Sequence, residues 1–258
     1  MWCLHQALDV TFNTVSHVLP KCVGNERQQI LPKGVVCDKC NNYFGQQTEP
    51  ALLNDPIFHI IAVVLRFKHP VKNKLFRERI FDEQHPTVRG EHQKLHCDTE
   101  ISDRGIILNI DYSTEGQISK SYELRDLAFL SRAVHKISFE SLAWGLFVKG
   151  WHEEIDLFDS SFDVIRKWTR YGEPINSVRP VLRLQRLDTI NHNWEYHVWG
   201  RQGALFGELN LFGDWYGVSF TSSPDKAGTD LKNFVGAQRP DYPIWCIGEN
   251  LTTLNRLA

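Results

Sequence analysis

The feature that most limits how the start of this chain can fold is the pair Cys37 and Cys40 in "GVVCDKCNNYFG". A Cys-x-x-Cys pair lets two thiolates bind one tetrahedral Zn²⁺ at about 2.3 Å. Cys3 lies where the partner of such a knuckle is expected. The position three residues later is not a cysteine, so His5 is the best candidate for the fourth ligand. These residues predict one structural zinc. The alternatives are two buried cysteines in a turn, or a redox pair, which the lack of a surrounding βαβ pattern disfavours.

Composition limits the classes of protein that remain. Of 258 residues, 42% are hydrophobic and 23% are charged, which is enough apolar material for a buried core. The net charge of -2 gives no overall attraction to nucleic acid, so such a partner has to meet a local patch. We find no signal peptide and no apolar run of bilayer length, and we therefore expect a cytoplasmic protein with no membrane partner. In that compartment, six cysteines do not imply disulfides. The sequence gives no oligomeric state.

Local patterns predict an α+β protein. A boundary near residue 52 separates a short module, 1–52, from residues 53–258, with a second subdivision near residue 175. Asp55 and the proline after it predict a helix start that continues to Phe67. Helices are also expected over 123–149, where Leu127, Leu130, Val134 and Ile137 form a stripe, and over 162–172, ended by a glycine. Strands are expected at 106–112 and in four runs after residue 175, namely "VLRLQRL", "WEYHVWG", "ALFGELNLF" and "YGVSF", which indicate a mixed helical and antiparallel-sheet domain.

A histidine within an apolar run, His17 in "SHVLPKCVGN", precedes the motif "VVCDKCNNYFG". In this order the two motifs resemble the HNH endonucleases, and more narrowly their bacterial zinc-knuckle branch. The resemblance covers residues 3–50, and "RAVHKISFESLAWGLFVKG" is similar to the helical tail that often follows such domains. It implies a ββα-metal nuclease module held together by zinc, with His17 as general base and Asn41 as ligand of a catalytic Mg²⁺ or Mn²⁺. The implied activity is hydrolysis of phosphodiester bonds, with DNA as the expected substrate. The implied role is defence of bacteria against foreign DNA, alongside a partner protein of a defence system.

Two positions depart from the family pattern. The residue before the base often supplies a metal ligand, and here it is Ser16, a poor one. Glu49, water or a substrate phosphate are the candidates to replace it. The asparagine that braces the hairpin in the family has Asn25 and Asn42 as candidates. The alternative reading is a zinc-containing module that binds nucleic acid or a partner and has lost catalysis, with His17 as a structural histidine.

Basic side chains give candidates for contacts with a nucleic-acid backbone. Arg166, Lys167 and Arg170 in "VIRKWTRYG" are the predicted binding residues, and a solvated face is the alternative. Other candidates lie in "RFKHPVKNKLFRERI" and at Arg179, Arg183 and Arg186. For Trp194, Trp199 and Trp215, packing in a sheet is favoured over stacking on bases.

Overall fold

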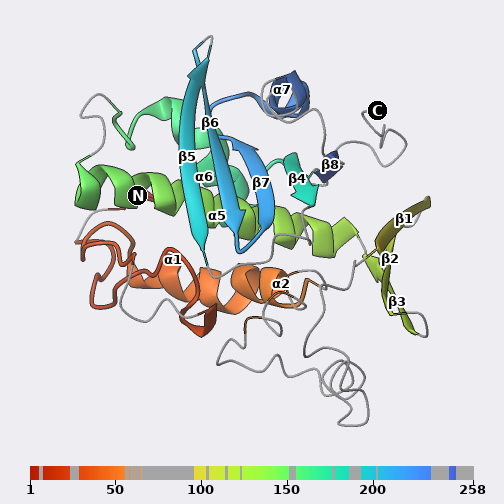
Figure 1. Ribbon diagram of the computed structural model, residues 1–258. Helices are drawn as coiled ribbons and strands as arrows, with labels where there is room; N and C mark the ends of the chain where they lie inside the picture. The colour runs from red at the N-terminus through yellow and green to blue at the C-terminus, as the bar shows by residue number, and fades with distance from the viewer. Residues whose placement is uncertain are drawn as a thin grey trace.

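The computed structural model describes residues 1–5, 8–23, 29–55, 58, 61, 65, 96–102, 105–113, 116–122, 124–150, 155–175, 178–185, 193–201, 203–233 and 244–247. The coarse prediction of a mixed helical and antiparallel-sheet protein is confirmed (Figure 1). The basic stretch at 66–80, Asn25 and Arg186 lie outside the described residues. In the part of the chain described, no helix combines the length and the apolar character needed to cross a bilayer.

The N-terminal part ends in a helical stretch that runs from residue 38 to residue 53. It comprises α1 (Asp38–Tyr43), the π-helical segment η2 (Phe44–Thr48) and α2 (Glu49–Leu53). Before it lie the short helix η1 (Lys21–Val23) and an antiparallel bridge between His17 and Ile30. The amide of Val18 donates to the carbonyl of Gln29, and the amide of Leu31 to that of Ser16. Two short extended segments therefore pair just ahead of the helix.

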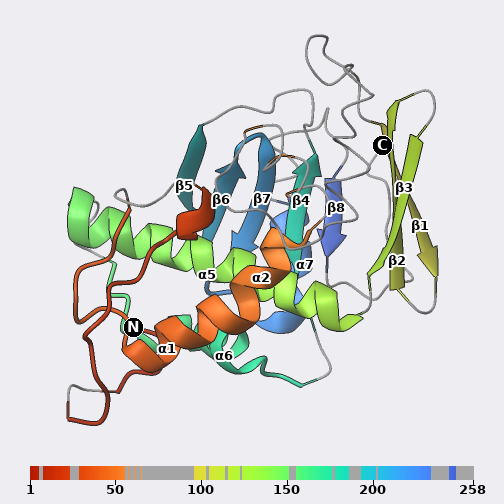
Figure 2. The ribbon, with the colours of Figure 1, turned by 90° about the horizontal axis from the view of Figure 1, so that it is seen from below.

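Helix α5 (Leu124–Lys149) crosses the middle of the molecule, between the helical stretch 38–53 and the larger sheet (Figures 1 and 2). The expected stripe is buried: Leu127, Leu130, Val134 and Ile137 are at most 3% exposed. Burial is nevertheless wider than a stripe, because every residue from 130 to 143 is buried. A helix covered on all sides has its polar face in the protein interior, where each polar group needs a partner.

The larger sheet has the order β5-β6-β7-β4-β8 with antiparallel neighbours throughout. Its strands are β4 (Val181–Gln185), β5 (Trp194–Arg201), β6 (Ala204–Leu211), β7 (Asp214–Ser219) and β8 (Ile244–Ile247). The four strands expected after residue 175 are confirmed. A smaller antiparallel sheet of β1 (His96–Ser102), β2 (Gly105–Ser113) and β3 (Gly116–Tyr122) contains the strand expected at 106–112.

Within the described residues, the other helices with given bounds are η4 (Ser160–Phe162), α6 (Asp163–Tyr171) and α7 (Pro224–Leu231). The predicted end of α6 is confirmed, because Gly172 follows it in a left-handed conformation with φ 72°. A glycine takes this conformation without the steric conflict that a Cβ would cause.

A continuous core joins the two sides of the expected boundary near residue 52. Trp2 packs edge-on against Phe44 and Phe139, with ring centroids 4.9 and 5.1 Å apart, and Phe139 in turn contacts Phe162 and Phe220. The helix expected from Asp55 to Phe67 lies largely outside the described residues. Phe58 and Ile61 are helical, and the Asp55 carboxylate accepts the Phe58 amide as an N-cap does.

Candidate functional site

Three cysteines from two separate segments meet at the N-terminal end of α1. The ligand atoms of Cys3, Cys37 and Cys40 all lie within 4.8 Å of one another. The Sγ atoms of Cys3 and Cys37 are 3.6 Å apart, whereas a disulfide bond measures about 2.0 Å. Four ligands placed tetrahedrally at about 2.3 Å from Zn²⁺ are about 3.8 Å apart. The spacing and the soft donor set of this cluster therefore fit a tetrahedral thiolate site.

The electrostatics of the cluster oppose the ionisation of a second thiol once one of them is a thiolate. Burial opposes ionisation of Cys3, yet hydrogen bonds from His5, Cys37 and Cys40 lower the pKa of Cys3 to about 7. Burial and the charge of Cys3 raise the pKa of Cys40 to about 12. One thiolate thus forms readily and hinders the next, and a bound cation would remove the conflict. His5, an exposed residue, lowers the pKa of Cys3, but the ligand atoms that lie within 4.8 Å of one another are those of the three cysteines, so His5 stays the predicted fourth ligand.

Helix α1 begins directly after Cys37 and carries Asn41 in its first turns. The Asn41 amide donates to the Cys37 carbonyl, which closes the first helical turn. Its side-chain nitrogen donates to Thr14 Oγ1 and to the carbonyl of Val15, both at 3.1 Å. A carbonyl only accepts hydrogen bonds, so the nitrogen must face Val15, and Oδ1 is the atom left to bind a cation. Asn41 thereby braces the segment before His17, whereas Asn42 is exposed and Asn25 lies outside the described residues.

Asp38 holds residues 11–14, which lead into the extended segment of His17. The sequence did not reveal this role. The Asp38 carboxylate accepts the amides of Asn13 and Thr14 and the hydroxyls of Thr11 and Thr14. These hydrogen bonds, first of all those from Thr11 and Thr14, hold the pKa of Asp38 well below its usual range. The segment 11–14 is therefore tied to the same helix as Asn41.

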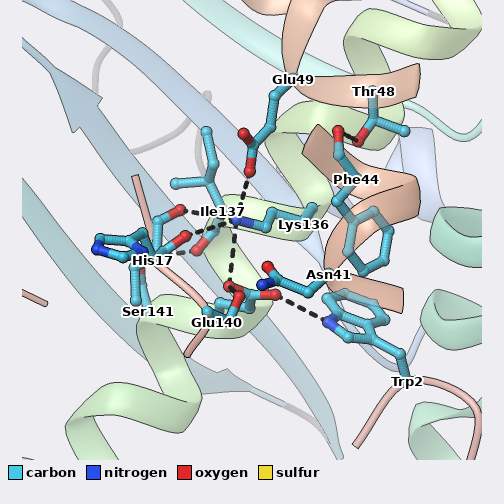
Figure 3. Close-up of polar contacts among 12 residues, drawn as sticks. Trp2, His17, Asn41, Phe44, Thr48, Glu49, Lys136, Ile137, Glu140 and Ser141 are labelled. Carbon is cyan, nitrogen blue, oxygen red and sulfur yellow. Dashed lines mark hydrogen bonds and ion pairs between the residues drawn. The ribbon is translucent and has the colours of Figure 1, made fainter. Parts of the chain in front are cut away.

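The main chain at His17 is held by a buried lysine of α5. Lys136 Nζ lies 2.7 Å from the His17 carbonyl oxygen and 3.2 Å from that of Val18. The same nitrogen pairs with Glu49 at 2.9 Å and with Glu140 at 3.2 Å. The imidazole of His17, which is half-buried, projects away from this ammonium group (Figure 3). Burial alone would lower the pKa of Lys136, but the charges of Glu140 and Glu49 outweigh it and hold that pKa above its ordinary value.

Glu140 receives two further donors from the N-terminal segment. Trp2 Nε1 donates to Oε1 at 2.9 Å (Figure 3). The hydroxyl of Ser16 donates to Oε2, also at 2.9 Å. Ser16 is 2% exposed, so its side chain lies in the core. Ser16 and Glu49, which the sequence offered as ligands of a catalytic ion, are thus both engaged with the Lys136–Glu140 pair.

The predicted nucleic-acid-binding residues of α6 lie in three different environments. Arg166 is 2% exposed, contacts the carbonyls of Leu157 and Asp159, and pairs with Asp163. Arg170 is half-buried, with its guanidinium 4.0 Å from the centre of the Tyr43 ring, and it acts to lower the pKa of Cys40 against the larger effect of burial. Lys167 is exposed. The three residues therefore do not form one basic surface.

The other candidates for backbone contacts are also divided. Arg183 is buried and pairs with Asp55 and Asp214, and Arg179 is buried against the carbonyls of Ser219 and Ser222. Among the tryptophans, Trp194 packs partly buried against the core, whereas Trp199 is 47% exposed.

Sequence reasoning missed Lys136 and Glu140 because they lie far along the chain from the motifs. The signal available was a lysine and a glutamate four residues apart on a helix whose neighbours are apolar.

Comparison of the chain with protein-family models, with curated proteins and with solved structures finds no match.

Proposed function

We propose that this chain is a metal-dependent endonuclease of the HNH type that hydrolyses phosphodiester bonds in DNA. The observation that carries the proposal is the pairing of the His17 strand with residues 29–31, followed by a helix whose Asn41 donates to that same strand. Two extended segments joined by a β-bridge and followed by a helix are compatible with the order of elements in the ββα-metal module. The cysteine cluster at the start of the helix supports a structural zinc bound by Cys3, Cys37, Cys40 and His5.

In this proposal the residues have separate tasks. His17 accepts a proton from the attacking water, which a positioned base does best when its main chain is fixed. Asn41 offers Oδ1 to a Mg²⁺ or Mn²⁺ ion, which supplies positive charge to the phosphate oxygens during hydrolysis. The zinc ligands connect the segment of Cys3 to the helix of Asn41. This division follows the chemistry of phosphodiester hydrolysis, which needs a base, a cation and a rigid frame.

The same resemblance supports a biological role in defence against foreign DNA, in the bacterial cytoplasm and together with a partner protein. Lys167 is the residue of α6 best placed to meet a DNA backbone, because its side chain is exposed. Arg170, beside Tyr43 and Cys40, connects that helix to the cysteine cluster.

Nicking of supercoiled plasmid in Mg²⁺ or Mn²⁺, with EDTA as the metal-free control, tests the activity. We expect His17→Ala to lower the rate by about 10²–10⁴-fold, the range for loss of a general base. His197→Ala, at an exposed histidine of β5, is the matched control and should retain the parent rate. Equal cleavage by the parent and His17→Ala would contradict the assignment of His17.

A second candidate function is a zinc-containing module that binds nucleic acid or a partner without cleaving it. The observation that favours it is the engagement of Ser16 with Glu140 and of Glu49 with Lys136, which leaves Asn41 as the metal ligand predicted from the motif. A folded, zinc-loaded protein that cleaves no form of DNA or RNA would support this second function.

A further inference from the structure

We propose that Lys136 is the positioning residue of the candidate base, and that helix α5 therefore completes a site that the sequence motifs place entirely within residues 1–52. This inference rests on the proposed function of His17. It extends the site to helix α5, which lies near the middle of the chain and far in sequence from the motifs.

The contacts of Lys136 have a geometry that few side chains can provide. An ammonium group carries three donors on one atom at the end of a flexible stem. Lys136 Nζ meets two successive carbonyls, those of His17 and Val18, and the carboxylate of Glu49. An apolar residue would take this donor away from all three acceptors, and the loss of a donor is costly for a buried carbonyl such as that of Val18. A lysine at this point therefore fixes the peptide groups on both sides of the Val18 Cα.

These contacts set the distance between the two halves of the candidate site. The carbonyls belong to the strand of His17, and Glu49 belongs to the helical stretch 38–53 that also carries Asn41. Lys136 thus connects the strand of the base to the helix of the metal ligand. Asn41 makes a second connection between the same two elements through Val15. Two connections at different points restrict rotation of the strand against the helix.

Glu140 extends this network to the cysteine cluster. It accepts hydrogen bonds from Ser16, which precedes the base, and from Trp2, which precedes Cys3. A buried pair is costly to desolvate and is a weak source of stability, so its contribution here lies in geometry. Through Glu140, the pair holds Ser16 and Trp2, the neighbours of His17 and Cys3, against one turn of α5.

The test removes both buried charges together, in Lys136→Met/Glu140→Gln. The double exchange avoids leaving Glu140 as a buried, unpaired charge, and the glutamine oxygen can still accept from Trp2. The carbonyls of His17 and Val18 lose their donor. We expect kcat for plasmid nicking in Mn²⁺ to fall by about 100-fold, the scale of a small misplacement of a catalytic group. KM for DNA and zinc content should not change.

Two further measurements separate positioning from general destabilisation. Ile137→Ala, at the buried neighbour on α5, should lower the melting temperature without the loss of kcat. Hydrogen exchange of the Val18 and Leu31 amides, which close the hairpin, should become faster in the double variant and not in Ile137→Ala.

The outcomes distinguish this inference from the proposed function. An active parent together with an equally active double variant would overturn the role of Lys136 and leave the nuclease proposal intact. The role of Lys136 would also be overturned if Ile137→Ala, at the same melting temperature as the double variant, lost as much kcat as that variant. A parent that does not cleave would refute the nuclease proposal, and unchanged exchange at Val18 and Leu31 would then separately refute the positioning.

Discussion

The side-chain nitrogen of Asn41 lies 3.1 Å from the carbonyl oxygen of Val15, so the residue proposed to bind the catalytic ion also braces the strand of the proposed base. The two functions use different atoms of one amide, Nδ2 for the brace and Oδ1 for the ion. Substitutions that alter one atom and keep the other can therefore separate them.

Asn41→Asp tests this separation directly. A carboxylate is a stronger ligand for Mg²⁺ than an amide oxygen, but it cannot donate to Val15. We expect a lower metal concentration for half-maximal cleavage together with a reduced kcat, and a loss of about 1 kcal/mol in unfolding free energy for one hydrogen bond. Metal titration of the nicking rate and urea unfolding measure the two effects. A higher metal requirement in Asn41→Asp would argue against Asn41 as a ligand.

The cysteine cluster predicts about one zinc per chain, as the four-ligand logic of a structural site requires. Cys37→Ser should abolish zinc binding and unfold the N-terminal part, because metal binding and folding are coupled in small units of this kind. Cys97→Ser, outside the predicted ligand set, is the matched control. Elemental analysis and near-ultraviolet circular dichroism report the two effects. Protein purified without chelators and free of zinc would refute the site.

The different environments of the α6 residues predict that they respond differently to substitution. Lys167→Glu should weaken DNA binding and reduce its salt dependence by about one counterion, with stability unchanged. Arg166→Met should act on stability, by about 2 kcal/mol, because it removes charged hydrogen bonds from a buried position. Fluorescence anisotropy across a salt series and urea unfolding measure the effects. Binding by Lys167→Glu that is as tight and as salt-dependent as that of the parent would place the DNA on another surface.

His135 predicts a specific loss of stability in weak acid. Burial, with the charge of Arg179, lowers the pKa of His135 to about 3. A histidine in the unfolded chain has a pKa of about 6.5. Between about pH 6.5 and pH 3 the unfolded state therefore binds one more proton than the folded state, and the free energy of unfolding decreases as the pH is lowered. At pH 5 this effect amounts to about 2 kcal/mol relative to neutral pH.

The variant His135→Gln should lack this contribution, while other groups that titrate remain in both proteins. Urea unfolding of the parent and the variant at pH 7.5 and pH 5.0 gives the comparison. The parent should lose about 2 kcal/mol more than the variant between the two conditions. Parallel losses would mean that His135 is protonated in the folded protein.

The elements that the sequence predicted correctly are those defined by local chemistry. Helix α6 ends at Gly172 because the left-handed position favours glycine, and the strands after residue 175 follow their alternating and aromatic patterns. The convergence of Cys3 on Cys37 and Cys40 was predicted in the same way, since a Cys-x-x-Cys pair needs further ligands to close a site.

Burial of polar residues was harder to predict. The stripe of α5 was predicted correctly, but nothing local to Lys136 and Glu140 shows that their face meets the segment of Trp2 and Ser16. Arg166 was expected at a basic surface, and only the loop at Leu157 and Asp159, which folds back over α6, explains its burial. Such contacts depend on the tertiary arrangement and leave little mark on the local sequence.

The connection between Lys136 and the His17 strand also has a consequence for the order of events during synthesis. Cys3, Cys37 and Cys40 leave the ribosome well before α5, and at ordinary translation rates Lys136 follows Cys40 by about 5–20 s. The nascent chain can therefore acquire zinc while the carbonyls of His17 and Val18 still lack their lysine. In the proposed nuclease, catalytic competence would then come only after α5 has docked, so that an incomplete chain carries the proposed metal ligands without the aligned base.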